Sequence, residues 1–135
     1  YIKVIFYYFY IVLLSHIILY LIVVNNKNEV KMIKAKNIIS DRGNPITNQI
    51  IITDEKKDRE IFQSYDSIIA IKEYKPERYS YAVPEEHKTN VTLDEYYWNY
   101  SRTTSKYRNI FLNETTEETK RKIKEGIYQL VNLNK

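Results

Sequence analysis

Three basic side chains lie close together toward the carboxyl-terminal end of the chain. They fall within residues 99–112, a stretch that contains no aspartate or glutamate and has a local charge of +3. Aromatic residues stand directly before them. Cationic side chains contact phosphates and aromatic rings stack on bases, so this combination is typical of proteins that bind single-stranded or structured nucleic acid. The residues that we expect to form the binding surface are Tyr97, Trp98, Tyr100, Arg102, Lys106 and Arg108.

A purely structural explanation of these residues stands beside the functional one. Trp98 and Tyr107 have the size to fill the space between a helix and a sheet. The cations would then form a solvated face or pair with the acidic residues that follow them, Glu114, Glu117 and Glu118. The sequence alone leaves both alternatives open.

Catalytic chemistry has little support in this chain. There is no cysteine, and His87 lies in a charged loop beside Glu85 and Glu86, where a histidine is usually solvated. Gly43 and Gly126 stand alone, so no glycine-rich phosphate loop is present. We therefore expect a protein that is not an enzyme, with no catalytic residue, no metal site, no cofactor and no small-molecule substrate.

Two helices are expected to carry and follow the basic residues. The first, residues 101–112, has a helical period with Thr103, Tyr107, Ile110 and Phe111 on one stripe and Arg102, Lys106 and Asn109 on the opposite, basic one. The second, residues 116–125, begins with Thr115 and Glu118 in the pattern of a capping box and stops before Gly126. This second helix has only a thin apolar stripe, so it must pack on a sheet.

Runs rich in β-branched residues predict the strands of that sheet. They cover residues 46–53, 59–72, 91–94 and 127–133, and residues 36–40 are a further short strand candidate. The run 59–72 is either one long bent strand or two short ones broken near Asp66. The runs 46–53 and 59–72 are expected to pair as a hairpin, and Tyr65 is expected among its apolar side chains. Residues 74–89 hold two of the three prolines and predict a mobile excursion. The expected fold is α+β: a small, mostly antiparallel sheet with two short helices on one face.

The amino-terminal segment allows two interpretations. Residues 1–24 are almost entirely apolar or aromatic and are long enough to cross a bilayer as a helix. However, Met32 is the only methionine, and Glu29 and Val30 just before it can be encoded by GAG-GTN, which contains the core of a bacterial ribosome-binding site. Residues 1–31 are therefore either translated upstream DNA, the interpretation we favour, or a transmembrane anchor, and residues 32–135 form the domain.

The charge of residues 32–135 limits how strongly the domain can bind phosphate. These residues include 18 basic and 16 acidic ones, for a net charge of +2. Strong phosphate binding needs several uncompensated contacts. Binding must therefore depend on the local surface around Arg102.

Several tracts of the sequence resemble a known family. RGN, TNQIIIT, FQSYDSIIA, the tract WNYSRTTSKYRNIFL and ETKRKIKEGIYQLVNLN are similar to small uncharacterised proteins from phages and prophages of low-GC Gram-positive bacteria, over residues 32–134. The resemblance implies an accessory phage protein in the cytoplasm of an infected bacterium that begins at Met32. It implies no activity.

Three functional hypotheses follow from these observations. The first is a non-enzymatic phage accessory protein that binds nucleic acid or a nucleoprotein through the basic helix. The second is a protein-binding inhibitor of a host or defence enzyme. The third is a single-pass membrane protein, which requires residues 1–31 to be genuine.

Overall fold

The structure, a computed structural model, describes residues 10–20 and 32–135. The chain divides into two compact units, Tyr1–Lys31 and Met32–Lys135. In the first unit, residues 10–20 form a helix with exposed, mostly apolar side chains. None of the helices in the described ranges has the length and apolar character needed to cross a membrane. The apolar run predicted to span a bilayer, residues 1–24, lies partly outside the described residues.

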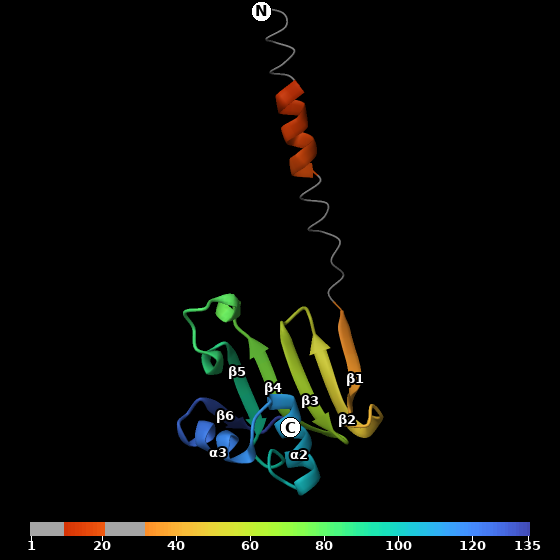
Figure 1. The fold of residues 1–135 in the computed structure, drawn as a ribbon, viewed down its shortest axis with the longest axis vertical. Coiled ribbons are helices and arrows are strands. Elements are labelled where there is room, and N and C mark those ends of the chain that lie inside the picture. The colour runs from red at the N-terminus through yellow and green to blue at the C-terminus, as the bar shows by residue number, and fades with distance from the viewer. Residues whose placement is uncertain (1–9, 21–31) are drawn as a thin grey trace, which may run out of the picture. The chain divides into compact units, whose positions relative to one another are not determined.

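Six strands form a single sheet in the order β1-β2-β3-β4-β5-β6 (Figure 1). Each strand is antiparallel to its neighbour except β6, which runs parallel to β5. The helices α2 (Arg102–Leu112) and α3 (Thr116–Lys124) form the crossover between these two strands. The strands are β1 (Ile33–Ile39), β2 (Pro45–Asp54), β3 (Arg59–Ser64), β4 (Ser67–Tyr74), β5 (Thr89–Asp94) and β6 (Tyr128–Val131). The predicted α+β fold with a mostly antiparallel sheet is confirmed.

The run 59–72 forms two strands, β3 and β4, joined by a tight turn. Tyr65 in this turn has a φ of 52°, and its backbone N–H donates to the carbonyl of Asn48 at 2.7 Å. Its side chain is 62% exposed, so the expectation that Tyr65 joins the apolar side chains of the hairpin is wrong. The turn directs its ring outward because the backbone there leaves the alternation of the strands.

The excursion between β4 and β5 contains two short 3-10 helices, η1 (Pro76–Tyr79) and η2 (Glu85–His87). The backbone N–H of Lys75 donates to the carbonyl of Lys88 at 3.0 Å, which closes the base of the excursion. Its length therefore does not disturb the pairing of the two strands that it connects.

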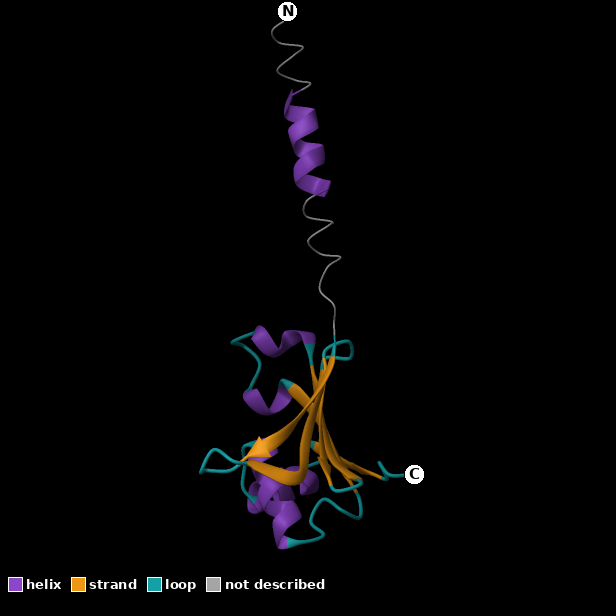
Figure 2. Ribbon diagram, turned by 90° about the vertical axis from the view of Figure 1, so that its right-hand side faces the viewer, coloured by secondary structure: helices purple, strands orange, loops and turns teal. Residues whose placement is uncertain are grey.

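The apolar core lies between the sheet and the two helices, which pack on one side of it (Figure 2). Phe62 on β3 and Phe111 on α2 meet at its centre with ring centroids 5.7 Å apart. Burial of apolar surface of this kind is the main stabilising contribution in a small domain. The buried apolar residues are Ile38, Phe62, Ile69, Ala70, Val91, Leu93, Phe111 and Tyr128.

Asp94, at the end of β5, fixes the segment that leads into α2. Its Oδ1 accepts hydrogen bonds from the backbone N–H groups of Tyr96 (3.0 Å) and Tyr97 (2.8 Å). Its Oδ2 accepts from the N–H of Leu133 (2.8 Å) and from the side-chain amide of Asn134 (2.9 Å). This buried carboxylate therefore ties residues 95–100 and the segment after β6 to the same strand end.

The opposite side of the sheet carries a row of half-buried isoleucines. Side chains alternate between the two faces of a strand, and Phe62 points toward the helices, so Ile61 points away from them. The strand register aligns Ile61 with Ile52 on β2 and Ile71 on β4. Within the unit Met32–Lys135, the helices α2 and α3 both lie on the other side (Figure 2). We refer to Ile52, Ile61 and Ile71 as the isoleucine row.

Candidate functional site

The helix α2 is defined by caps at both ends. At its start, Ser101 Oγ accepts a hydrogen bond from the backbone N–H of Thr104 at 3.1 Å. At its end, Asn113 adopts the left-handed conformation with φ 55°. These caps satisfy backbone groups that a helix leaves unpaired. The first turn contains no acidic residue, so no carboxylate there opposes an approaching anion.

Arg102 and Lys106 are exposed on the outer surface of α2, one helical turn apart. Their place on the predicted basic stripe is confirmed. Within residues 10–20 and 32–135, neither side chain forms an ion pair or a hydrogen bond. Lys106 Nζ lies 5.5 Å from the centroid of the Tyr107 ring. The two charges are therefore not neutralised by carboxylates of the described fold.

Arg108 was predicted to belong to the same surface, and this prediction is wrong. Its side chain is 0% exposed. The guanidinium lies 5.1 Å from the Trp98 ring centroid, and it donates hydrogen bonds to the Trp98 carbonyl, to Asn109 Oδ1 at 2.6 Å and to Thr116 Oγ1 at 3.0 Å. Burial lowers the pKa of Arg108 below its ordinary value, although the nearby carboxylate of Glu114 opposes this shift.

The error arises from the rotation of the helix about its axis. The buried stripe of α2 consists of Thr104, Arg108 and Phe111, whereas the sequence pattern suggested Thr103, Tyr107, Ile110 and Phe111. Ile110 is exposed instead. Arginine can take a core position because its aliphatic stem packs like an apolar side chain while its head finds hydrogen-bond acceptors. The acceptors here come from residues 98 and 116, whose approach to Arg108 the sequence does not reveal.

The aromatic residues before α2 divide into two groups. Trp98 is half-buried under the Arg108 guanidinium and packs against the core, as the structural alternative predicted for it. Tyr97 and Tyr100 form an edge-to-face pair with ring centroids 5.6 Å apart. Tyr100 is 74% exposed, so it joins Arg102 and Lys106 on the accessible surface.

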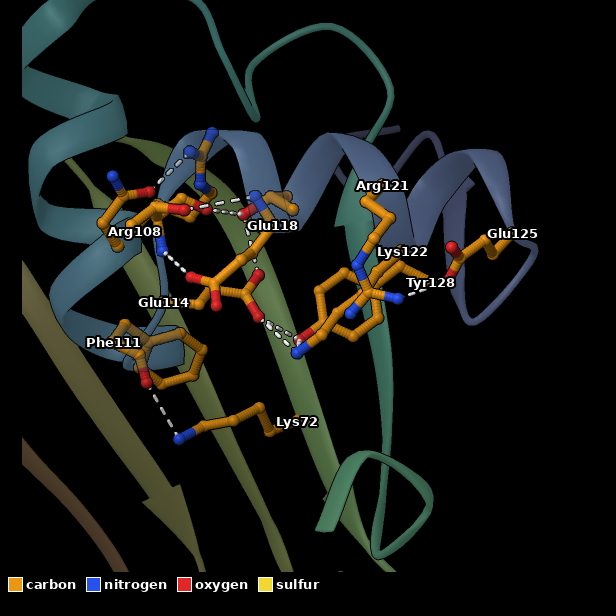
Figure 3. Close-up of polar contacts among 12 residues, drawn as sticks. Lys72, Arg108, Phe111, Glu114, Glu118, Arg121, Lys122, Glu125 and Tyr128 are labelled. Atoms are coloured by element: carbon orange, nitrogen blue, oxygen red, sulfur yellow. Dashed lines mark hydrogen bonds and ion pairs between the residues drawn. The ribbon is translucent and has the colours of Figure 1, made fainter. Parts of the chain in front are cut away.

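A polar network holds α3 against the sheet (Figure 3). Glu114 Oε2 accepts hydrogen bonds from Lys122 Nζ at 2.6 Å and from the Tyr128 hydroxyl at 2.8 Å, while its Oε1 accepts from Thr119 at 2.7 Å. Burial and the bond to Glu114 raise the pKa of Tyr128 to about 12. Burial acts to lower the pKa of Lys122, but its hydrogen bonds to Glu114 and Tyr128 have the larger effect, so the pKa is raised. The Tyr128 hydroxyl and the Lys122 ammonium group therefore keep their protons at neutral pH, which suits a structural role and not proton transfer.

A groove of about 580 Å³ lies beside this network, between α3, the sheet and the excursion. Lys72 on its wall pairs with Glu60 at 3.1 Å. It also donates to the Phe111 carbonyl at 3.0 Å (Figure 3). Tyr74 donates to the same Glu60 at 2.7 Å. Burial and this hydrogen bond raise the pKa of Tyr74. Lys72 and Lys122 thus already have carboxylate partners, and a bound anion would have to compete with them.

A second, smaller pocket of about 240 Å³ lies between the start of α2 and the β3–β4 turn. Tyr97 and Tyr100 line it, together with Tyr65, Ser67 and Thr104. Sequence reasoning missed Tyr65 and Ser67 because the turn is 30 residues or more before α2 in the chain, and it missed Thr104 because the predicted rotation of α2 was wrong. No pattern in the sequence shows that the fold brings them together. In the described ranges, no three histidine, cysteine, aspartate or glutamate side chains gather as a metal site.

Comparison with known proteins gives a family but no activity. The model of a protein family of unknown function matches residues 33–126, from the start of β1 to the residue after α3 and its C-cap. No curated protein and no solved structure matches the chain. The matched residues include both faces of α2 and the pocket beside it.

Proposed function

The chain belongs to the family of unknown function DUF8033, and from the geometry of α2 we propose that it binds nucleic acid, alone or in a nucleoprotein, and is not an enzyme. The observation that carries this proposal is the pair of exposed, unneutralised cations Arg102 and Lys106 beside the exposed ring of Tyr100. Cations of this kind contact phosphates, and an exposed tyrosine offers a face for base stacking.

The expected binding is weak and moderately sensitive to salt. Two phosphate contacts on a single strand predict a slope of about −1.4 for log K against log salt concentration, since each contact contributes about −0.7. The burial of Arg108 removes the third contact that the sequence suggested. Affinity beyond this must come from aromatic contacts.

The biological setting that we propose is that of a phage or prophage accessory protein in the cytoplasm of a bacterial host. The sequence resemblance supports this setting. The alternative location is the membrane, through an anchor formed by residues 1–24. The intact mass of the protein isolated from its native source distinguishes the two, because a chain that begins at Met32 has no such anchor.

The test is a charge reversal on α2. We expect Arg102→Glu combined with Lys106→Glu to lower the affinity for single-stranded oligonucleotides at least tenfold at low salt and to flatten the salt dependence. Fluorescence anisotropy across a salt series measures both quantities. Circular dichroism checks that the variant is folded.

The matched control is Lys120→Glu combined with Lys124→Glu on α3. Both lysines are exposed and one helical turn apart, so the net charge changes by the same amount. The control variant should retain most of the affinity. If it loses binding while the α2 variant keeps it, the site lies on α3 and the proposal is wrong.

A second candidate function is the binding of a protein partner, such as a host or defence enzyme that the protein would inhibit. The isoleucine row favours it, because α2 and α3 leave this apolar sheet face uncovered and such a face is a frequent contact surface. This function predicts a stoichiometric complex that Ile61→Lys abolishes and Arg102→Glu does not. It also predicts no salt-dependent binding of oligonucleotides.

A further inference from the structure

The pocket beside α2 has the lining of a site for a planar, uncharged ring. Three tyrosines contribute to its wall: Tyr65 from the β3–β4 turn, and Tyr97 and Tyr100 from the segment before α2. Three hydroxyl groups, those of Ser64, Ser67 and Thr104, also line it. None of the side chains that line it carries a charge. Such a lining offers stacking surfaces and hydrogen bonds but no partner for an ion.

Tyr65 is held in a backbone conformation that disfavours its side chain. A φ of 52° is unfavourable for a bulky residue, and glycine or asparagine is usual there. The turn is fixed by two hydrogen bonds, from the N–H of Tyr65 to the Asn48 carbonyl at 2.7 Å and from Gln63 Nε2 to the Tyr65 carbonyl at 2.7 Å. Because the ring is 62% exposed, core packing does not explain why a tyrosine stands here.

The other two tyrosines are also fixed in place. The backbone N–H of Tyr97 donates to Asp94 Oδ1 at 2.8 Å, and the backbone N–H of Tyr100 donates to the Tyr97 carbonyl at 3.2 Å. Their edge-to-face contact leaves the Tyr100 ring 74% exposed. A ring that enters the pocket would therefore meet aromatic residues whose backbone is already held in place, which reduces part of the entropic cost of binding.

The hydroxyl groups give the pocket a polar side. Thr104 Oγ1 lies 2.9 Å from Ser101 Oγ. Ser64 is buried, and its partner across the sheet, Gln49, has a buried side-chain oxygen with no donor among the described residues. Hydroxyl groups both donate and accept, so they can bond to the edge of a heterocycle without requiring one particular base.

We propose that this pocket receives one unstacked base of a single-stranded nucleic acid while Arg102 and Lys106 contact the adjoining phosphates. This inference rests on the function proposed above and specifies its ligand. Tyr100 lines the pocket and Arg102 follows it by two residues in the first turn of α2, so a strand that passes over the start of this helix can reach both. A volume of about 240 Å³ is below the roughly 300–1,000 Å³ of typical small-molecule sites. It suits one ring system and not a whole nucleotide.

The experiment compares strands that differ in whether they carry bases and in whether their sugar is that of DNA or RNA. The probes are an oligothymidylate, an oligouridylate and an abasic strand of the same length, each titrated into the full-length protein by fluorescence anisotropy. We expect the base-containing strands to bind roughly 5- to 100-fold more tightly than the abasic strand, as for one base stacked on an aromatic ring. If the oligothymidylate binds more tightly than the oligouridylate, the site prefers DNA, and the reverse order indicates RNA.

Two variants act on the pocket without changing charge. Tyr100→Leu removes the exposed ring, and Ser67→Leu fills the space while leaving all three tyrosines. Each should abolish the preference for base-containing strands and leave the affinity for the abasic strand and the salt slope unchanged. Tyr81→Leu is the control, because Tyr81 is fully exposed and does not line the pocket.

The outcomes separate this inference from the proposed function. Equal binding of abasic and base-containing strands by the wild-type protein overturns the pocket inference, while salt-dependent binding through Arg102 and Lys106 still stands. A preference for bases that persists in both pocket variants also overturns it. Failure of every strand to bind overturns both. Loss of the preference in both variants, with the Tyr81→Leu control unaffected, supports the inference.

Discussion

Arg108 is a buried cation whose hydrogen-bond partners are all uncharged. Its guanidinium bonds to the Trp98 carbonyl, to Asn109 and to Thr116, so one side chain joins α2 to the segment before it and to the start of α3. Its Nε has no acceptor among the described residues. A buried charge held in this way stabilises the arrangement only while every neighbouring acceptor stays in place.

Truncation of Arg108 should therefore be costly. We expect Arg108→Ala to lower the free energy of unfolding by about 2–4 kcal/mol, because it leaves a cavity and an unpaired Trp98 carbonyl. Arg108→Met should cost less, since the methionine fills part of the volume. Urea denaturation followed by the fluorescence of Trp98, the only tryptophan, measures the change.

Arg102→Ala provides the comparison. This side chain is exposed and unpaired in the described part of the chain, so its loss should change stability by no more than about 0.5 kcal/mol. Equal destabilisation by the two alanine variants would contradict the structural role assigned to Arg108. The pair thus separates a cation that supports the fold from one that is available to a ligand.

At the scale of elements, local signals predicted the helices well and their orientation poorly. Thr115 and Gly126 marked the ends of α3 to within a residue, because caps depend on neighbours in the sequence. The rotation of α2 about its own axis depends on groups outside the helix, such as the Trp98 carbonyl. The positions of Tyr107 and Ile110 in the sequence therefore predicted the wrong buried face. The pocket formed with the β3–β4 turn could not be predicted, because turn and helix meet only through the sheet.

The carboxylate at the end of β5 makes the stability of the fold sensitive to acid. Burial acts to raise the pKa of Asp94, but hydrogen bonds from Leu133, Tyr97, Tyr96 and Asn134 lower it below its ordinary value of 3.8. The folded state thus favours the ionised carboxylate. Its contribution to stability is fully present above pH 3.8 and is lost as the pH falls through the lower value of the folded protein.

Asp94→Asn should test this contribution. We expect it to lower the free energy of unfolding by about 2 kcal/mol at pH 7, because an amide oxygen accepts these hydrogen bonds more weakly than a carboxylate oxygen does. The amide nitrogen would also point its own N–H groups at the N–H donors that bond to Asp94. The difference from the wild-type protein should shrink as the pH falls below 3.8, where the native carboxylate also takes up a proton. A difference that stays constant from pH 7 to pH 2 would contradict the assignment. Thermal unfolding across this pH range measures it.

At the scale of the whole molecule, every buried apolar core residue within the described ranges belongs to the unit Met32–Lys135. The described helix of the other unit, residues 10–20, has exposed side chains throughout. We therefore predict that a chain of residues 32–135 folds cooperatively. Its urea midpoint, followed by Trp98 fluorescence, should match that of the same transition in the full-length protein. A broad or absent transition would show that residues 1–31 contribute to the fold.

The parallel pairing of β6 with β5 sets the order in which the sheet is completed. Strands β2 to β5 each pair with the strand just before them, so these pairings can form as synthesis proceeds. The outer edge of β5 waits for a strand that arrives more than 30 residues later, and the same delay applies to the donors that Leu133 and Asn134 supply to Asp94. Until then the nascent domain presents an open strand edge, which is the stage at which chaperones or aggregation would compete with folding.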